Sequence, residues 1–257
     1  MDIIKFMQNH RSIRKYKPDQ IPDEVLSEIL EAGIRASSSG NMQTYSIIVT
    51  SDPILRGELF EWHSKQSMGL DAPVLITFCA DFHRMRKWLR LRKADDNFDN
   101  FLGFMVSAID AILVSQNVAL AAESKGLGIC YLGSTMANCD QIGRILNLPS
   151  NVVPVVGFSL GYPDEDPPTR DRLPLEGLVH YEKYQDYSDE QINEIYRQRE
   201  IKGWERYMSY PRLRRKVEES GVKNLAQLYT TVKYPRESHQ AYSTRILNYL
   251  KLQDFLK

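Results

Sequence analysis

The chain lacks several features that define common classes of protein. Its 257 residues include only three cysteines, Cys79, Cys130 and Cys139, with no Cys-x-x-Cys spacing and no histidine at metal-ligand spacing. We therefore expect no disulfide framework and no metal site, but buried, reduced thiols of a cytoplasmic protein. Lysine plus arginine equals aspartate plus glutamate at 33 each, so the overall charge indicates no polyanionic partner such as nucleic acid.

Long apolar runs are also missing. The first residues, 1–5, contain no apolar stretch of the kind that a secretory signal needs, so we expect none. The most apolar window, 101–122, is interrupted by Asp110, Gln116 and Asn117, which favours a core helix over a membrane span. With 42% hydrophobic residues, the chain can still bury a sizeable core, in one large domain or two small ones.

No motif for a protein-borne nucleophile, metal or dinucleotide is present. The patterns His-Glu-x-x-His, Gly-x-Ser-x-Gly, Gly-x-Gly-x-x-Gly and the phosphate-binding Walker loop do not occur, and no internal repeat is visible. The short run Gly126-Leu127-Gly128 is not a dinucleotide fingerprint. If the protein is an enzyme, a cofactor must therefore carry the chemistry.

A basic segment, His10-Arg11-Ser12-Ile13-Arg14-Lys15-Tyr16, is the most conspicuous feature that is present. Its alternation predicts a short extended segment with Arg11 and Arg14 on different sides, where they could bind two parts of one anionic ligand. Arginine suits this because its guanidinium binds phosphate bidentately and stays charged. The alternative is a solvated basic turn before a helix. A second arginine pair, Arg170 and Arg172, and a polar cluster at 37–43 favour the ligand site.

Apolar periodicity predicts a mixed order of helices and strands. Helices are expected at 2–9, 22–36, 54–64, 98–124 and 138–146, and strands at 45–50, 73–80, 129–132 and 152–160. Residues 81–100 are expected to form a mobile or partly helical excursion. The longest helix should be central to the fold or to a subunit interface, with a broad apolar face made of Phe101, Met105, Ala108, Ile109, Ile112, Leu113, Gln116, Ala119 and Leu120.

The composition changes after about Tyr181. From Lys183 onward the chain has 15 Lys and Arg against 10 Asp and Glu, a net of +5, and Ile192, Ile195 and Tyr196 have helical spacing. This tail is either a solvated extension or a segment that wraps a partner subunit or meets an anionic substrate. The basic run 212–216 allows nucleic-acid binding, but no recognised fold motif supports it.

Four segments resemble the nitroreductase family in order and spacing: 10–16, 37–43, 126–133 and 170–174. They are most similar to the oxygen-insensitive NADPH nitroreductases and related flavin reductases. The resemblance covers about 1–184 and implies an α+β fold, with a mixed, mainly antiparallel sheet flanked by helices and a helical C-terminal extension. It also implies an obligate homodimer with FMN in two interface sites. We expect an FMN-binding domain at 1–182 and a basic, Tyr-rich extension at 183–257, packed on the dimer.

The resemblance also implies roles for individual residues, and none of them is a catalytic side chain or a metal ligand. The phosphate of FMN would contact His10, Arg11, Ser12 and Arg172. Arg14 and Arg170 would lie at the pyrimidine edge and stabilise the anionic reduced flavin. The polar loop, usually contributed by the other subunit, would supply Ser37, Ser39, Asn41 and Gln43. The flavin ring would contact Gln66, Tyr131, Leu132, Gly133 and Ser134. Ordinary alternatives are helix-ending turn residues for the serines and an exposed loop amide for Gln66.

The implied activity is the reduction of nitroaromatics, quinones or flavins by NADPH or NADH, in a two-electron ping-pong cycle through FMN. Two departures from the family limit this prediction. Arg170 stands where the most similar relatives often have lysine, and the tail after Tyr187 differs from theirs, so the choice between NADPH and NADH stays open. The alternatives are another flavin activity, such as dehalogenation, or a non-catalytic FMN-binding or partner-binding role. No nucleic acid or membrane partner is expected.

Overall fold

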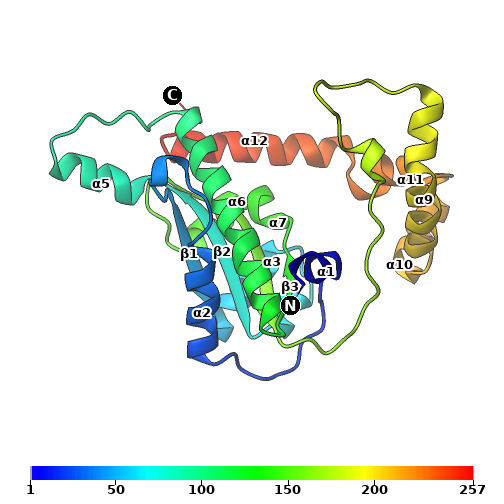
Figure 1. The fold of residues 1–257 in the computed structure, drawn as a ribbon, viewed down its shortest axis with the longest axis horizontal. Helices are drawn as coiled ribbons and strands as arrows, with labels where there is room; N and C mark the ends of the chain where they lie inside the picture. The colour runs from blue at the N-terminus through cyan, green and yellow to red at the C-terminus, as the bar shows by residue number, and fades with distance from the viewer. Residues whose placement is uncertain (1, 257) are drawn as a thin grey trace. The chain divides into compact units, whose positions relative to one another are not determined.

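The computed structural model describes residues 2–256, which form two compact units (Figure 1). The first unit contains the chain up to Pro168 together with the segment from Tyr242 onward, and the second is Thr169–Ala241. The predicted boundary between functional domains, at residues 182 and 183, stays a prediction.

The first unit is built on a four-stranded sheet whose strand order is β1-β2-β4-β3. Each neighbouring pair is antiparallel, with Tyr45 opposite Ala80 and Val74 opposite Leu160. The central strands are apolar over almost their whole length, as expected for strands covered on both faces. The bounds agree with the predicted ones to within one or two residues: β1 (Tyr45–Thr50), β2 (Val74–Asp81), β3 (Gly128–Tyr131) and β4 (Val152–Gly161).

Helices of the first unit begin where polar side chains can cap them. Asp2, Asp52 and Asn100 each accept a hydrogen bond from a backbone N–H in the first turn of the helix that follows. The excursion after β2 is partly helical, and a single turn at Ser134 was not predicted. The helices are α1 (Ile3–Gln8), α2 (Asp23–Gly33), η1 (Ser39–Asn41), α3 (Pro53–Trp62), α4 (Met68–Asp71), α5 (His83–Leu91), α6 (Phe101–Ser124), α7 (Ser134–Ala137) and α8 (Cys139–Ile145).

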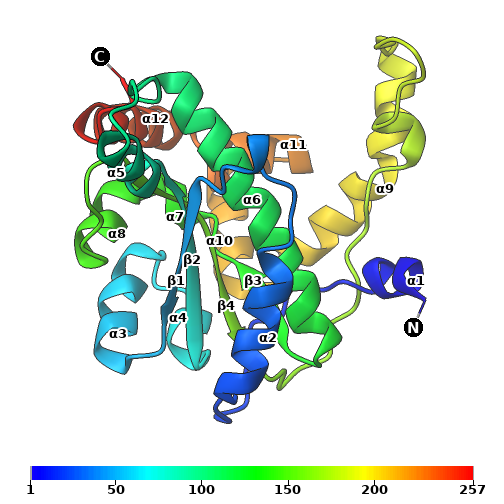
Figure 2. The same ribbon diagram turned by 60° about the vertical axis from the view of Figure 1, so that its left-hand side comes forward.

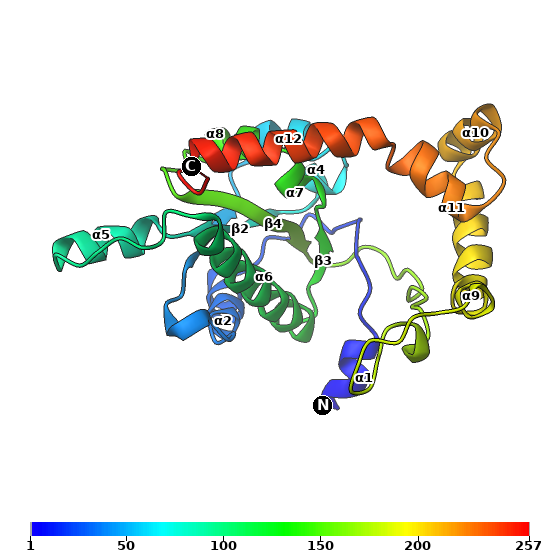
Figure 3. The same ribbon diagram turned by 90° about the horizontal axis from the view of Figure 1, so that it is seen from above.

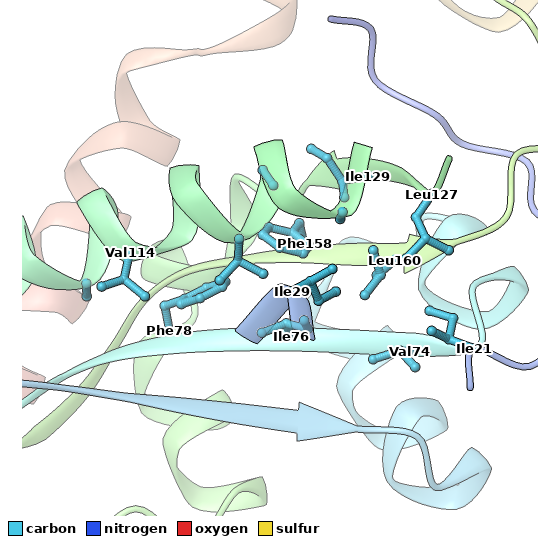
Figure 4. Packing of buried hydrophobic residues seen from close by; sticks show 14 of the residues in the cluster. Ile21, Ile29, Val74, Ile76, Phe78, Val114, Leu127, Ile129, Phe158 and Leu160 are labelled. Atoms are coloured by element: carbon cyan, nitrogen blue, oxygen red, sulfur yellow. The ribbon is translucent and has the colours of Figure 1, made fainter. Parts of the chain in front are cut away.

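Helices cover both faces of the sheet (Figure 2). On one face, α2 and α6 pack against a cluster that includes Ile29, Phe78, Val114 and Phe158 (Figure 4). On the other face, α3, α4 and α8 cover a second cluster, which includes Leu75. Because neighbouring residues of a strand point to opposite faces, Ile76 of β2 belongs to the first cluster and Leu75 to the second.

The orientation of α6 separates a buried side from an exposed side, which the predicted apolar face did not distinguish. Of the predicted apolar face, Ala108 and Ala119 are buried, but the five large side chains Phe101, Met105, Ile109, Ile112 and Leu113 are 39–50% exposed. Small residues such as Ala111 and Ala122 face the sheet instead. The helix is apolar around almost its whole circumference, so periodicity could not distinguish its two sides.

The same helix is long and apolar enough to cross a membrane by length and composition, but half of its most apolar window is buried inside the protein. It packs on α2, β2 and β4, which makes it a core helix of the fold.

The regular secondary structure of the second unit is helical, and the unit has few buried residues of its own. Ser188 and Gln191 form a reciprocal capping box at the start of its longest helix, which contains the predicted tail periodicity. Ile195 is buried there, whereas Ile192 and Tyr196 are 40% and 48% exposed. Its elements are η2 (Leu175–Gly177), α9 (Asp189–Met208), α10 (Pro211–Ser220), α11 (Leu225–Leu228), the π-helical η3 (Tyr229–Lys233) and the first residues of α12 (Arg236–Leu252).

The C-terminal part of α12 belongs to the first unit and lies beside α7 and α8 (Figure 3). Arg245 donates to the backbone oxygen of Ala137 at 3.2 Å, and Tyr249, Leu250 and Phe255 complete a third buried cluster.

Candidate cofactor site

The basic segment is extended, as predicted, and lies against the edge of the sheet. The N–H of Ile13 donates to the carbonyl of Ile129 at 2.8 Å, and the Tyr16 hydroxyl donates to the carbonyl of Ile13 at 2.7 Å. Ile13 packs so closely on Gly128 that a Cβ at that glycine would lie 2.5 Å from the Ile13 Cγ1 atom. The segment therefore has a fixed backbone, from which the Arg14 side chain is exposed to solvent.

His10 and Arg11 line a hollow of about 280 Å³ together with three acidic residues, Glu123, Glu165 and Asp166. The Arg11 guanidinium pairs with Asp166 and donates to the carbonyl of Pro167 at 3.3 Å. The His10 Nδ1 atom lies 2.6 Å from Glu123 Oε1. A phosphate that binds the Arg11 Nη1 atom would have to displace Asp166 from it. Because that carboxylate is 86% exposed, the exchange costs little, since such pairs contribute about 0–1 kcal/mol.

Ser12 and Arg14 continue this surface. The backbone N–H groups of Arg14 and Lys15 donate to Glu165 Oε1 at 2.5 and 3.2 Å. The Arg14 side chain also donates to the carbonyl of Ser12 at 3.4 Å. Glu165 thus holds the backbone and leaves most of the Arg14 guanidinium available to a ligand.

The polar loop at 37–43 is held by a residue that the sequence reasoning did not assign to the site. Asp110 of α6 is 0% exposed, and it accepts hydrogen bonds from the Ser38 hydroxyl at 2.7 Å and from the Ser39 N–H at 3.0 Å. The predicted ligand residues Ser37, Asn41 and Gln43 are exposed. The loop therefore has an ordered base and a solvent-exposed polar rim.

Two residues predicted to contact the ring share one partner, His63. Its Nδ1 atom lies 3.0 Å from the Ser134 hydroxyl, and its carbonyl accepts from Gln66 Nε2 at 3.0 Å. Burial lowers the pKa of His63 to about 4, so its imidazole is neutral at neutral pH. The Gln66 side chain is thus fixed rather than a freely exposed loop amide.

The segment after β3 presents the remaining first-unit residues of the prediction. The Tyr131 hydroxyl lies 3.1 Å from Ser115 of α6, and burial raises the pKa of Tyr131. The N–H of Leu132 donates to the carbonyl of Gly157 at 2.8 Å, whereas Gly133 is exposed. Leu132 therefore belongs to the core, and only its neighbour Gly133 presents open backbone.

Arg170 and Arg172 both lie in the second unit and are exposed. The Arg172 side chain donates to the carbonyls of Arg170 and Asp171 at 3.3 and 3.2 Å. Burial raises the pKa of Asp171, but the hydrogen bond and the positive charge of Arg199, a backbone hydrogen bond and the charge of Arg206 together lower it, and the net shift is downward. The predicted roles of Arg172 in phosphate binding and of Arg170 at the flavin ring stay predictions.

Three residues near these segments were missed: Asp110, Glu123 and His63. For Asp110 a signal existed, because a carboxylate interrupts the most apolar window of the chain. Glu123 and His63 act through partners 113 and 71 residues away, which no local pattern shows.

Comparison with known proteins defines the family. The nitroreductase family model matches residues 7–162, more than half of the chain, and the chain belongs to this family. An NADPH-dependent oxidoreductase from Staphylococcus saprophyticus is 36% identical over 193 residues, 74% of this chain and 76% of that protein. The NADPH-flavin oxidoreductase of Vibrio harveyi is 35% identical over 187 residues, 71% of this chain and 75% of that protein. The crystal structure of an oxidoreductase from Bacteroides fragilis has a TM-score of 0.90 and 38% identity, covering 98% of this chain and 100% of that one. The predicted family and α+β fold are confirmed.

Proposed function

We propose that this protein is an NAD(P)H-dependent oxidoreductase that uses FMN to reduce flavins, quinones or nitroaromatics, acting as a cytoplasmic homodimer. The observation that carries the proposal is the 35% identity with the NADPH-flavin oxidoreductase of Vibrio harveyi across 71% of the chain. The matched family region contains the basic segment and the polar loop, the two segments with exposed groups suited to a phosphorylated, polyhydroxylated ligand.

The fit to FMN rests on the chemistry of these groups. Arg11 can exchange the exposed Asp166 for a phosphate, and Arg14 presents a second positive charge nearby on the same segment. When bound, FMN supplies the acceptance of a hydride from the nicotinamide and its delivery to the acceptor. The residues that would hold it are His10, Arg11, Ser12, Arg14, Ser37, Ser39, Asn41, Gln43, Gln66, Tyr131, Leu132, Gly133, Ser134, Arg170 and Arg172.

These residues have separable tasks in the proposal. His10, Arg11, Ser12 and Arg172 bind the phosphate, while Arg14 and Arg170 place positive charge where reduction of the ring adds negative charge. His63 is neutral at neutral pH and orients Ser134 through their 3.0 Å contact. No acidic or nucleophilic side chain is needed for bond making in this scheme.

The proposed homodimer would cover the exposed row on α6. Phe101, Met105, Ile109, Ile112 and Leu113 each leave at least 39% of their surface in water, although α6 is otherwise a core helix. An apolar row of this length is typical of an obligate interface, which buries on the order of 2,000 Å² or more. Light scattering of the FMN-loaded protein at micromolar concentration should report a dimer, and a monomer with FMN bound would disprove it.

One anaerobic titration tests the activity. The purified chain, reconstituted with FMN, should lose its flavin absorbance on addition of NADPH or NADH and regain it with a flavin, a quinone or a nitroaromatic acceptor. Failure of both nicotinamides to bleach the bound flavin would overturn the proposal. If both substrates use one pocket in turn, double-reciprocal plots at several acceptor concentrations should be parallel, and intersecting lines would exclude that order.

A further inference from the structure

We propose that Asp110 is a positioning residue that holds residues 38–44, the polar loop from Ser38 onward with Thr44 at its end, in the shape that binds the cofactor. The proposal rests on the proposed function, in which the exposed residues of this loop contact FMN. Asp110 itself is buried, so it would act through the loop and never touch the ligand.

The contacts of Asp110 reach both ends of the loop. Its Oδ2 atom accepts from the Ser38 hydroxyl at 2.7 Å, the Thr44 hydroxyl at 3.1 Å and the Thr44 N–H at 3.4 Å. Its Oδ1 atom accepts from the Ser39 N–H at 3.0 Å. One carboxylate therefore joins the first and last residues of the loop to the middle of α6.

Ser38 extends this network to the exposed rim. Its hydroxyl donates to Asp110 and accepts from the Gln43 N–H at 2.8 Å. The Gln43 side chain in turn donates to Asn41 Oδ1 at 2.9 Å. Two of the rim residues that the proposal assigns to the cofactor, Asn41 and Gln43, are thus linked to Asp110 through Ser38.

The loop needs such support because its backbone is unfavourable. Gly40, Asn41 and Gln43 have positive φ angles of 56°, 54° and 53°. Glycine adopts this conformation freely, whereas glutamine rarely does. Hydrogen bonds to a buried carboxylate can stabilise that conformation before any ligand arrives.

An amide could not replace the carboxylate. Asp110 offers two acceptor atoms, and each receives a backbone N–H, one from Ser39 and one from Thr44. An asparagine has one oxygen, so in either orientation its NH₂ group would face a backbone donor. The hydroxyls of Ser38 and Thr44 can rotate to accept, but the backbone N–H groups cannot. Asp110→Asn should therefore release one end of the loop.

The position of Asp110 on α6 links the loop to the proposed dimer interface. Ile109, Ile112 and Leu113 next to it belong to the exposed row that the proposed dimer covers. Asp110 would therefore fix the loop relative to the interface helix, so that the loop reaches the site of the second copy in a set geometry.

The test uses the full chain with four substitutions. Asp110→Asn and Ser38→Ala remove parts of the network, and Ser38→Thr retains the hydroxyl. Ser107→Ala is the matched control, because Ser107 is equally buried on α6 but, within residues 2–256, its hydroxyl donates only to its own helix, to the carbonyls of Gly103 and Phe104. The FMN dissociation constant is measured by quenching of flavin fluorescence, and backbone exchange by hydrogen–deuterium exchange without FMN.

Asp110→Asn should weaken FMN binding about tenfold or more, and Ser38→Ala less. Ser38→Thr and Ser107→Ala should bind like the wild type. Exchange should accelerate at Ser39, Gln43 and Thr44 in the two weakened variants, while β2 stays protected. If a substitution only lowered the stability of the whole protein, exchange would accelerate in β2 as well as in the loop. Ser38→Thr would then not retain the FMN affinity of the wild type.

Unchanged FMN affinity and unchanged loop exchange in both Asp110→Asn and Ser38→Ala would overturn the proposal. If Asp110→Asn does not fold, Ser38→Ala and Ser38→Thr decide the outcome. If the wild type itself does not bind FMN, the proposed function fails. In that case hydrogen–deuterium exchange alone tests the role of Asp110. Faster loop exchange in Asp110→Asn and Ser38→Ala supports its structural role, and unchanged exchange overturns it.

Discussion

The basic segment and the polar loop, which carry most of the proposed FMN contacts in the first unit, are held in opposite ways. Arg11 of the basic segment pairs with Asp166, and these side chains are 35% and 86% exposed. The loop is fixed by Asp110, which is 0% exposed and accepts four hydrogen bonds. Exposed pairs contribute about 0–1 kcal/mol, whereas a hydrogen bond to a charged group contributes about 1.5–3 kcal/mol, and Asp110 accepts several of them while buried. The basic segment can therefore exchange its partner for a ligand, and the loop is formed in advance.

The largest expected effect comes from removing the ligand-binding arginine. Arg11→Ala should weaken FMN binding about ten- to a hundredfold, because a charge-assisted hydrogen bond to phosphate contributes roughly 1.5–3 kcal/mol. The reduction potential of bound FMN should change little, since the phosphate is remote from the ring. Equilibrium dialysis measures the affinity. Lys17→Ala, which removes an exposed positive charge nearby, is the control, and unchanged FMN retention in Arg11→Ala would contradict the assignment.

A second prediction concerns His63, a buried support like Asp110. Burial lowers the pKa of His63 from 6.5 in the unfolded chain to about 4 in the folded chain. At a pH between these two values, the unfolded chain therefore binds a proton that the folded chain excludes. Stability should therefore decrease as pH falls, and His63 should account for about 2 kcal/mol between about pH 7 and pH 5. Urea unfolding of the wild type and His63→Gln at both pH values isolates this contribution, because other titrating groups are common to both. Equal pH dependence in the two proteins would disprove it.

The sequence predicted the parts of this comparison that depend on local pattern. Strands β1, β2 and β4 follow from apolar and β-branched runs. The basic segment and the polar loop were proposed as ligand elements from residue type and from the family resemblance. The supports were not recognised, because Asp110 and Ser38 are 72 residues apart and His10 and Glu123 are 113 apart. The buried face of α6 was also missed, since a helix that is apolar all round has no distinctive periodicity. Local pattern therefore supplied the proposed ligand groups, which stay a prediction, and only tertiary structure showed which residues hold those segments in place.

Arg14 should affect the ring rather than cofactor retention. Arg14→Gln removes a positive charge from the proposed pyrimidine edge and should lower the FMN potential and slow reduction by NADPH several-fold, with FMN still bound. Arg14→Lys, which keeps the charge, is the matched comparison and should retain most of the potential. Potentiometric titration against a reference dye measures the shift. An unchanged potential in Arg14→Gln would show that this side chain lies away from the ring.

The smallest expected effect is a gain in FMN affinity rather than a loss. It tests directly whether Arg11 of the basic segment exchanges Asp166 for the ligand. Asp166 competes with the ligand for Arg11, so Asp166→Asn should tighten FMN binding rather than weaken it. The exposed pair contributes at most about 1 kcal/mol, so the gain should not exceed about fivefold. Asp164→Asn removes a second exposed carboxylate from the same loop, one whose backbone N–H donates to the carbonyl of Lys15 at 3.0 Å, and should give a smaller gain. The gain from Asp166→Asn should also shrink at high salt, because an exposed pair is screened there already. Weaker FMN binding in Asp166→Asn would mean that the carboxylate supports the site rather than competing for Arg11, and that the Arg11 side chain is positioned in advance, as the loop is.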